Sequence, residues 1–401
     1  MVSKAYKGVE KIKDINPQPH FSKMTEKITR EEIWEIVDSY DTENLCLGSL
    51  GGHSALDVCS GAKKHGFNTI AVCQKGREKT YTEYYKSRGG KGCIDETIVL
   101  KKFSDITEPE IVKKLQELNT IFIHNRYFWV YFNFDDVETK FRVPIFGNRS
   151  LLKTEERDVC PNQYDFLEKA DIRIPKHFSN AKDIDRLVLV KASEACRGYE
   201  RAFFFASSYE DYMKKSDELL GRGIFTEESL ETAVIEEYVI GAQVNFNFFY
   251  SPIDEELELM GTDMRRQTNL DGLLRLPAKQ QVEVLKYTEP KYIETGHAAC
   301  TVKESLLEKA FDAGRRFAET LKKEASPGII GPFALQGAIS AGPPKEELVV
   351  FDVSMRIPGS PGTRFTPYSG YLYGKSVSCG ERIAMEIKKA VNEGRLKELV
   401  T

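Results

Sequence analysis

The feature that most constrains the fold is one stretch near the N-terminus, residues 43–78, which reads ENLCLGSLGGHSALDVCSGAKKHGFNTIAVCQKGRE. An apolar run and a glycine turn come first, then an amphipathic segment from Ser54 to Lys64, Gly66, and a second apolar run, NTIAVC. Short apolar runs bounded by glycine are typical of buried strands, and the middle segment has the spacing of a helix. The stretch therefore predicts a βαβ unit, with a parallel sheet and right-handed crossovers.

Further elements surround this unit. A short helix follows Thr29, which is a plausible N-cap, and TIFIH at residues 120–124 predicts another strand. Four later segments alternate in the manner of antiparallel strands: RLVLVKAS, RAFFFASS, AVIEEYVI and VNFNFFYS. A long amphipathic helix is expected after them, at ESLLEKAFDAGRRFAETLKKEA. This order predicts two or three α/β and α+β domains around a cleft.

Composition excludes several classes of partner. The 401 residues carry a net charge of −4 and no long basic block, so neither nucleic acid nor an anionic membrane surface is expected. The chain has no apolar run of eighteen residues and no apolar leader, and its eight cysteines form no C-x-x-C pair. These features are typical of a cytoplasmic protein with reduced cysteines.

The C-terminal region ends in an apparent hairpin, GPFALQGAISAGPPKEELVVFDVSMR, residues 331–356. Alternation in its second run places Val349, Phe351, Val353 and Met355 on one face, and Val350, Asp352, Ser354 and Arg356 on the other. The mixed face suits a solvated edge, but Gln336 and Asp352 could also meet across the hairpin as oxygen ligands for Mg²⁺.

Four other segments could carry chemistry. The turn LGSLGGHSA, which contains His53, could bind an anion at a helix N-terminus or could simply be tight. Lys191 could hold a phosphate or extend from a strand end into solvent. The run IEEYVIG at 235–241 could hold adenine and ribose, or its glutamates could be solvated. The run GTDMRRQTNLDG could bind an anionic substrate or form an exposed polar loop.

The order of Lys191, EEYVIG and the Gln336/Asp352 hairpin resembles the ATP-grasp superfamily. The match is closest to the archaeal PurP family of formate-dependent synthetases and covers nearly all of the chain from about residue 30. It is carried by segments such as LGSLGGHSAL, VPIFGNRSLL, TNLDGLLRLPAKQQ, ESLLEKAF and VVFDVSMR. The resemblance implies an ATP-grasp fold preceded by a Rossmann-like α/β domain. It implies a polar tail at 1–28, the α/β domain at 29–145, and the ATP-grasp domain at 146–401 with a lid of about 187–245.

The resemblance also implies an activity. Such enzymes use ATP and Mg²⁺, with Mn²⁺ as a possible substitute, to convert formate to formyl phosphate. The 5-amino group of aminoimidazole-carboxamide ribonucleotide (AICAR) then attacks it, giving ADP, phosphate and the formylated nucleotide (FAICAR) in purine synthesis. Its partners would be these small molecules, and a homo-oligomer is expected.

Site residues follow from the same resemblance. For the nucleotide substrate they are His53, Tyr127, Arg265 and Asn269; for ATP, Lys191, Glu236, Glu237, Tyr238, Val239 and Gln243; for the metal, Gln336 and Asp352; and for clamping the transferred phosphoryl group, Arg356. The polar face of the last strand then becomes a wall for metal and phosphate.

The chain departs from the family pattern at several positions. HNRYF stands where PHGSF is expected, so Tyr127 replaces a small serine and could reshape the substrate pocket. The loop after Lys191 keeps only Gly198, Asp352 replaces the commoner glutamate, and Gln243 stands where an acid is frequent. Two alternatives therefore stay open: an ATP-grasp ligase for another carboxylate and amine, and a nucleotide-binding protein without turnover.

Overall fold

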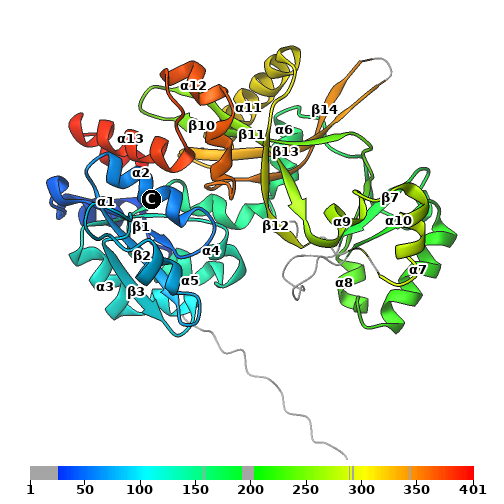
Figure 1. Cartoon of the computed structure of the whole chain (residues 1–401), viewed down its shortest axis with the longest axis horizontal. Coiled ribbons are helices and arrows are strands. Elements are labelled where there is room, and N and C mark those ends of the chain that lie inside the picture. The colour runs from blue at the N-terminus through cyan, green and yellow to red at the C-terminus, as the bar shows by residue number, and fades with distance from the viewer. Residues whose placement is uncertain (1–25, 157–158, 192–202, 289, 291–292, 343–344) are drawn as a thin grey trace, which may run out of the picture.

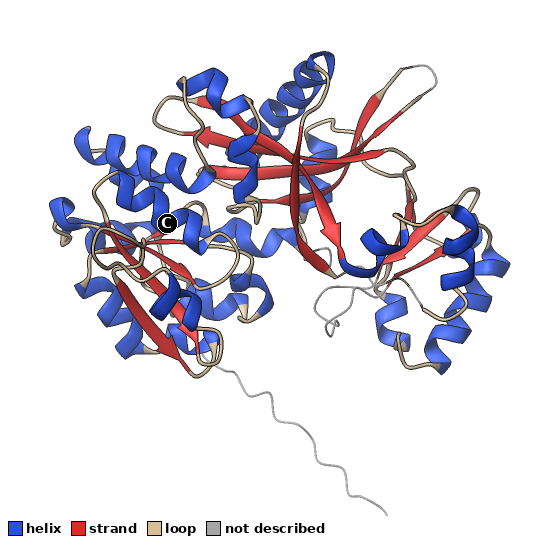
Figure 2. Ribbon diagram, in the orientation of Figure 1, coloured by secondary structure: helices blue, strands red, loops and turns tan. Residues whose placement is uncertain are grey.

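The computed structural model describes residues 26–156, 159–191, 203–288, 290, 293–342 and 345–401. Residues 1–25 of the expected tail and the loop at 192–202, with Gly198, lie outside the described residues. Figures 1 and 2 show three parts: an N-terminal α/β part, a central sheet with helices on its outer side, and a smaller lobe beyond it.

The N-terminal part contains the predicted parallel sheet. Its strands are β1 (Cys46–Leu50), β2 (Asn68–Gln74), β3 (Glu96–Leu100), β4 (Thr120–Ile123) and β5 (Ile145–Phe146), in the order β3-β2-β1-β4-β5. All four neighbouring pairs are parallel. The helices are α1 (Arg30–Asp38), α2 (Ala55–Lys64), α3 (Pro109–Glu117), α4 (Tyr127–Val130) and α5 (Phe134–Thr139). Thr29 caps α1 in a capping box with Glu32, so the predicted N-cap is confirmed.

The central sheet is antiparallel, in the order β12-β11-β10-β13-β14. Its strands are β10 (Ala242–Ser251), β11 (Glu256–Gln267), β12 (Glu294–Cys300), β13 (Gly331–Ser340) and β14 (Glu347–Ser354). The predicted long helix is α11 (Glu304–Glu324), which packs with α6 (Gln163–Lys169) over a phenylalanine-rich core. The polar run at 261–272, for which an exposed loop was one alternative, forms the end of β11 and most of α9 (Thr268–Leu273). Helix α10 (Ala278–Val284) follows.

The smaller lobe contains a four-stranded sheet in the order β6-β9-β7-β8. These strands are β6 (His177–Phe178), β7 (Val188–Lys191), β8 (Phe203–Ala206) and β9 (Val234–Glu237), all paired antiparallel. Helices α7 (Tyr209–Gly221) and α8 (Glu227–Glu231) accompany the sheet, which has its own small apolar core. This lobe overlaps the range of about 187–245 expected for a lid, but it begins earlier, at β6, and residues 242–245 belong to β10 of the central sheet.

The C-terminal segment returns to the N-terminal part. Helix α12 (Tyr368–Tyr373) precedes α13 (Cys379–Asn392), which packs against α2. The two helices touch at Gly61 and Gly380, where an added Cβ would lie about 2.4 Å from the backbone of the other helix. Thr401 then exchanges two backbone hydrogen bonds of 3.0 Å with Ile145. The end of the range 146–401 is thus built into the core of the N-terminal part.

The hairpin of β13 and β14 differs from the predicted alternation at one point. Its register slips after the pair Gln336↔Asp352, so that Gly337 faces Val350 and Phe351 is an extra residue. Val350 therefore packs in the core with Val353 and Met355, while the Phe351 ring lies 5.8 Å from the Lys191 Nζ. The predicted sides of Val350 and Phe351 are wrong, because a bulge resets an alternation with a period of two residues.

Candidate active site

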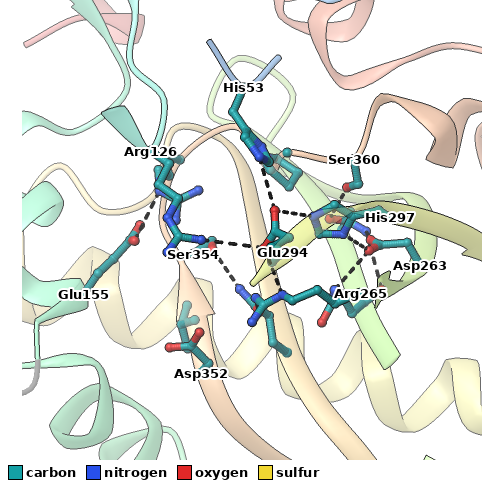
Figure 3. A pocket seen from close by; sticks show the side chains of 18 residues that line it. His53, Arg126, Glu155, Asp263, Arg265, Glu294, His297, Asp352, Ser354 and Ser360 are labelled. Carbon is teal, nitrogen blue, oxygen red and sulfur yellow. Dashed lines mark hydrogen bonds and ion pairs between the residues drawn. The ribbon is translucent and has the colours of Figure 1, made fainter. Parts of the chain in front are cut away.

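A cleft of about 670 Å³, part of it open to solvent, lies where the N-terminal part meets the central sheet (Figure 3). Polar and charged side chains dominate its walls. The lining residues are His53, Arg126, Glu155, Asn245, Asn247, Asp263, Arg265, Glu294, His297, Ala334, Gln336, Asp352, Val353, Ser354, Arg356, Pro358, Gly359 and Ser360. Of the residues predicted for the site, the cleft brings together His53, Arg265, Gln336, Asp352 and Arg356.

One wall comes from the carboxyl ends of the parallel strands. The strand order reverses direction between the neighbours β1 and β4, and His53 and Arg126 follow the ends of these two strands. In open α/β sheets such a switch point is where ligands bind, because the loops on either side diverge and leave a crevice. His53 and Arg126 are therefore placed for ligand contact by topology, although the sequence pattern had singled out only His53.

Close packing fixes the glycine turn that carries His53. Ser54 adopts φ 68° and its Oγ donates to the Pro358 carbonyl at 2.7 Å, which ties the turn to the far wall. Gly359 leaves room for the His53 ring, since a Cβ there would lie 1.7 Å from its Nδ1. The Tyr127 ring packs over Gly52 in the same way, and it contacts Phe103 rather than lining the cleft.

The opposite wall carries a buried charge cluster on β11 and β12. His297 Nδ1 contacts the Asp263 carboxylate, and its Nε2 lies 3.1 Å from Glu294 Oε1. Burial opposes the charge on His297, but these two hydrogen bonds outweigh burial and raise its pKa to about 9. Burial likewise opposes the charge on Glu294, but hydrogen bonds to His297 and His53 and the charge of Arg265 hold its pKa well below the ordinary value.

Asparagine side chains complete this cluster. Asn245 donates to Asp263 Oδ2 at 3.0 Å, and Asn247 donates to Oδ1 at 2.6 Å. A carboxylate held by two amides and one imidazole is buried at little cost, because each of its oxygens has a partner. These contacts hold the Asp263 carboxylate in one orientation at the centre of the cluster.

The Gln336–Asp352 pair lies beside this cluster. Gln336 Nε2 donates to Ser354 Oγ at 2.8 Å, which leaves its Oε1 directed at Arg265, whose NH2 donates to it at 2.6 Å. Asp352 is directly opposite on β14. Two oxygens from paired strands fit a Mg²⁺ ion that takes its other ligands from phosphates and water. Among the described residues no group of three or more His, Cys, Asp or Glu side chains could hold a metal alone.

Arg356 follows β14 and points into the cleft beside Glu155. The Arg356 Nε lies 3.3 Å from Glu155 Oε2, and Glu155 Oε1 accepts the Met355 N–H at 2.6 Å. Burial raises the pKa of Glu155 to about 7, although the charge of Arg356 opposes that rise. The short helical turn Arg149–Glu155 thus places a second acid, unforeseen from sequence, behind the guanidinium.

Lys191 at the end of β7 and Glu236 on β9 form an ion pair in the smaller lobe. The Lys191 Nζ contacts Glu236 Oε1, and the Tyr164 hydroxyl donates to Glu236 Oε2 at 2.9 Å. Only 15% of the lysine side chain and 3% of the glutamate side chain are exposed. The strand-end lysine is therefore turned inward and held, rather than extended into solvent.

The other predicted site residues are more scattered. Glu237 lies near Arg173 and Arg186 at the lid surface, Tyr238 packs on Phe205, Val239 is half-buried, and Gln243 is exposed at the start of β10. Asn269 is exposed on α9 and does not line the cleft. The structure adds Arg126, Glu155, Glu294 and His297 to the cleft. The predicted residues that do not line it are Tyr127, Asn269, Lys191, Glu236, Glu237, Tyr238, Val239 and Gln243.

Solved structures share this architecture. The ADP complex of an N5-carboxyaminoimidazole ribonucleotide synthetase matches with a TM-score of 0.54 and 12% identity, over 80% of this chain and 72% of that one. Biotin carboxylase from Campylobacter jejuni matches at 0.53 and 10%, over 85% and 70%. At these identities the likeness shows the fold alone. The parallel sheet, the small antiparallel lobe and the large antiparallel sheet together form the ATP-grasp fold.

Relatives of higher identity narrow this class. The IMP biosynthesis protein PurP from Thermococcus kodakaraensis matches with a TM-score of 0.65 and 27% identity, over 88% of this chain and 100% of that one. Two 5-formaminoimidazole-4-carboxamide-1-(β)-D-ribofuranosyl 5′-monophosphate synthetases match over 378 residues: that of Methanobrevibacter smithii is 38% identical and that of Methanothermobacter thermautotrophicus 39%. Both alignments cover 94% of this chain and 99% of the relative. The chain belongs to the PurP family of these synthetases.

Two sequence families defined without a function also match. A protein of unknown function, DUF1246, matches residues 47–178, and a domain of unknown function, DUF1297, matches residues 211–401. Neither description adds a function to the family assignment. In the part of the chain that the structure describes, every helix is too short or too polar to cross a membrane.

Proposed function

We propose that this chain is an ADP-forming ligase that joins formate to the 5-amino group of AICAR and so makes FAICAR in purine synthesis. An amine cannot displace hydroxide from formate at neutral pH, because hydroxide is a poor leaving group. Transfer of the γ-phosphoryl group of ATP to formate gives formyl phosphate and ADP. The amine then attacks the formyl carbon, the C–O bond to phosphate breaks, and the nitrogen loses a proton.

The ATP site is assigned to the lid and its junction with the central sheet. The inward-facing Lys191 would contact phosphate oxygens, and Glu236 holds it in place through the buried ion pair. The backbone from Glu236 to Val239 would bind adenine, with Glu237 and Tyr238 within it. Gln243 stands near the position expected for ribose contact.

Gln336 and Asp352 would hold the Mg²⁺ ion, or Mn²⁺ in its place. The metal would offset the negative charge of the ATP phosphates during transfer. Ser354 supports this role, because its bond to Gln336 Nε2 keeps the amide oxygen directed into the cleft. Arg356 would clamp the transferred phosphoryl group from the same polar strand face.

The nucleotide substrate is assigned to the switch-point wall and β11. His53 and Arg265 line the cleft and support this assignment directly. Tyr127 and Asn269 remain assigned by family position alone. The Tyr127 ring over Gly52 favours one alternative, a ligase of the same fold that acts on another carboxylate and amine.

One observation carries the proposal: the hairpin pair Gln336–Asp352 lines a cleft whose other wall is the switch point, and the Lys191 Nζ lies 5.8 Å from the ring of Phe351, the neighbour of Asp352. The test is phosphate release from ATP and Mg²⁺ with formate and AICAR, each omitted in turn. Release that needs both, with FAICAR identified by mass, is expected. Release with a different carboxylate or amine would support the alternative ligase, and ATP binding without release would support a non-catalytic protein.

A further inference from the structure

Basic side chains from separate parts of the chain converge on one carboxylate in the cleft, that of Glu294 (Figure 3). His53 Nε2 lies 3.1 Å from Glu294 Oε1, and His297 Nε2 lies 3.1 Å from the same oxygen. Arg265 Nε lies 3.1 Å from Oε2, and Arg126 NH1 lies 3.7 Å from it. Two histidines and two arginines around one acid bring more positive charge to the site than one carboxylate can neutralise.

The contacts of the two arginines with Glu294 provide charge without good hydrogen bonds. Arg265 Nε is buried and makes no hydrogen bond of acceptable geometry within the described residues, in spite of its 3.1 Å approach to Glu294. The distance from Arg126 to Glu294 exceeds that of a hydrogen bond. A buried N–H without an aligned acceptor is costly, and a ligand oxygen in the cleft would remove that cost. These donors are therefore arranged for a larger oxyanion than the one they hold.

When Glu294 is removed from the cluster, the charge of the remaining side chains is positive and favours an anion. Asp263 remains as the counter-ion of His297, whereas Arg126 and Arg265 both lose their contact with Glu294. The substrates proposed above are all oxyanions. Glu294 begins the edge strand β12, in which no residue is fully buried, so its side chain can turn toward solvent without displacing the apolar core. Gly296 follows at φ 149°, a conformation that glycine adopts without strain.

We propose that His53, Arg126, Arg265 and His297 form an oxyanion subsite for substrate, and that the carboxylate of Glu294 is its resident counter-ion, displaced when substrate enters. The identity of the substrate rests on the proposed function, but the existence of the subsite does not. The shared chemistry is a phosphate or carboxylate oxyanion, which the nucleotide phosphate and formate could each supply. Glu294 thus competes with substrate instead of binding it.

The test is calorimetric titration of the full-length protein, without ATP, with inorganic phosphate, ribose 5-phosphate and formate in separate experiments. Glu294→Gln removes the resident charge and is expected to tighten binding of at least one anion by about fivefold or more. Arg126→Gln removes a cation and is expected to weaken binding of the same anion about tenfold. Glu256→Gln, which removes an exposed carboxylate from the far end of the same sheet, is the charge control and should change nothing.

Each outcome decides the proposal. Tighter binding of the two phosphates assigns the subsite to the nucleotide phosphate, and tighter binding of formate assigns it to the carboxylate. Weaker or unchanged binding of all three anions in Glu294→Gln overturns the proposal, as does an equal gain in Glu256→Gln. Glu294→Asp, which retains the fold more readily and retracts the carboxylate, is expected to tighten binding in the same direction. Because no turnover is measured, failure here is distinct from failure of the phosphate-release assay.

Discussion

Gln336 on β13 lies directly opposite Asp352 on β14, and the ladder slips by one residue immediately beyond this pair. The bulge turns Phe351 toward the lid lysine and leaves the two oxygen-bearing side chains together on the cleft side of the sheet. A metal held between these two side chains would have its protein ligands positioned by the backbone pairing of β13 and β14. The following predictions depend on this arrangement and on the walls that face it.

Asp352→Asn should abolish Mg²⁺-dependent phosphate release while leaving the fold intact. The amide keeps the shape of the side chain but removes the charge that a hard cation requires, and a loss on the order of 100-fold or more is expected. Turnover is measured across a Mg²⁺ titration, and thermal melting checks the fold. Glu347→Gln, an exposed position on the same strand, is the matched control. Full activity in Asp352→Asn would remove this residue from the mechanism.

Lys191→Met should raise the KM for ATP by roughly 10-fold to 100-fold, because the buried ammonium that we propose contacts phosphate oxygens is lost. Its partner Glu236 is then left with the Tyr164 hydroxyl as the hydrogen-bond donor. The measurement is phosphate release as a function of ATP concentration. Lys215→Met provides the control, since Lys215 lies on α7 of the same lobe and pairs with Asp211. Equal effects of the two substitutions would contradict a specific role for Lys191.

Gly359→Ala should raise the KM for the nucleotide substrate and leave the KM for ATP nearly unchanged. The new methyl group would lie 1.7 Å from His53 Nδ1, so the imidazole must move out of its position in the cleft. Gly362→Ala serves as the control, because nothing lies within 4 Å of a Cβ at that position. Initial rates with each substrate varied separately make the measurement. A selective effect on ATP would show that His53 belongs to the other half of the reaction.

Because of His297, the free energy of unfolding should decrease as the pH rises from about 6.5 through 9. Its folded-state pKa of about 9 lies above the ordinary value near 6.5, so the folded state binds the extra proton between these values. The stabilisation is complete below pH 6.5 and is lost as the pH rises through 9, by ~1–3 kcal/mol. Urea unfolding of the protein and of His297→Gln at pH 6 and pH 9.5 measures this term. The same decrease in both proteins would place its origin elsewhere.

Local sequence patterns determined much of the fold. The βαβ unit, the N-cap at Thr29 and the long helix α11 all follow from spacing within a few residues, and each was found where it was predicted. The pairing of Gln336 with Asp352 was also foreseen, because a hairpin brings its two strands into one register. The bulge at Phe351 was not, since alternation of side chains carries no mark of an extra residue.

The additional cleft residues had no local signal. Glu294 stands in a segment of ordinary composition, and Arg126 lies in HNRYF, where only Tyr127 was noted. Their contact joins positions 168 residues apart across two parts of the chain. Asn269 is the opposite case: its polar run predicted a site, but part of that run forms a strand and the rest an exposed helix outside the cleft.

Association into a homo-oligomer stays a prediction.

The sequence by itself determined which elements form, the order in which they occur, and the family resemblance that proved correct. Only the tertiary structure decided which charges meet. Secondary structure depends on residues a few positions apart, whereas the cleft depends on the packing of the parallel sheet, through His53 and Arg126, against β11 and β12. The pKa values of Glu294 and His297 depend on that same packing, because burial and charged partners exist only after the parts have come together.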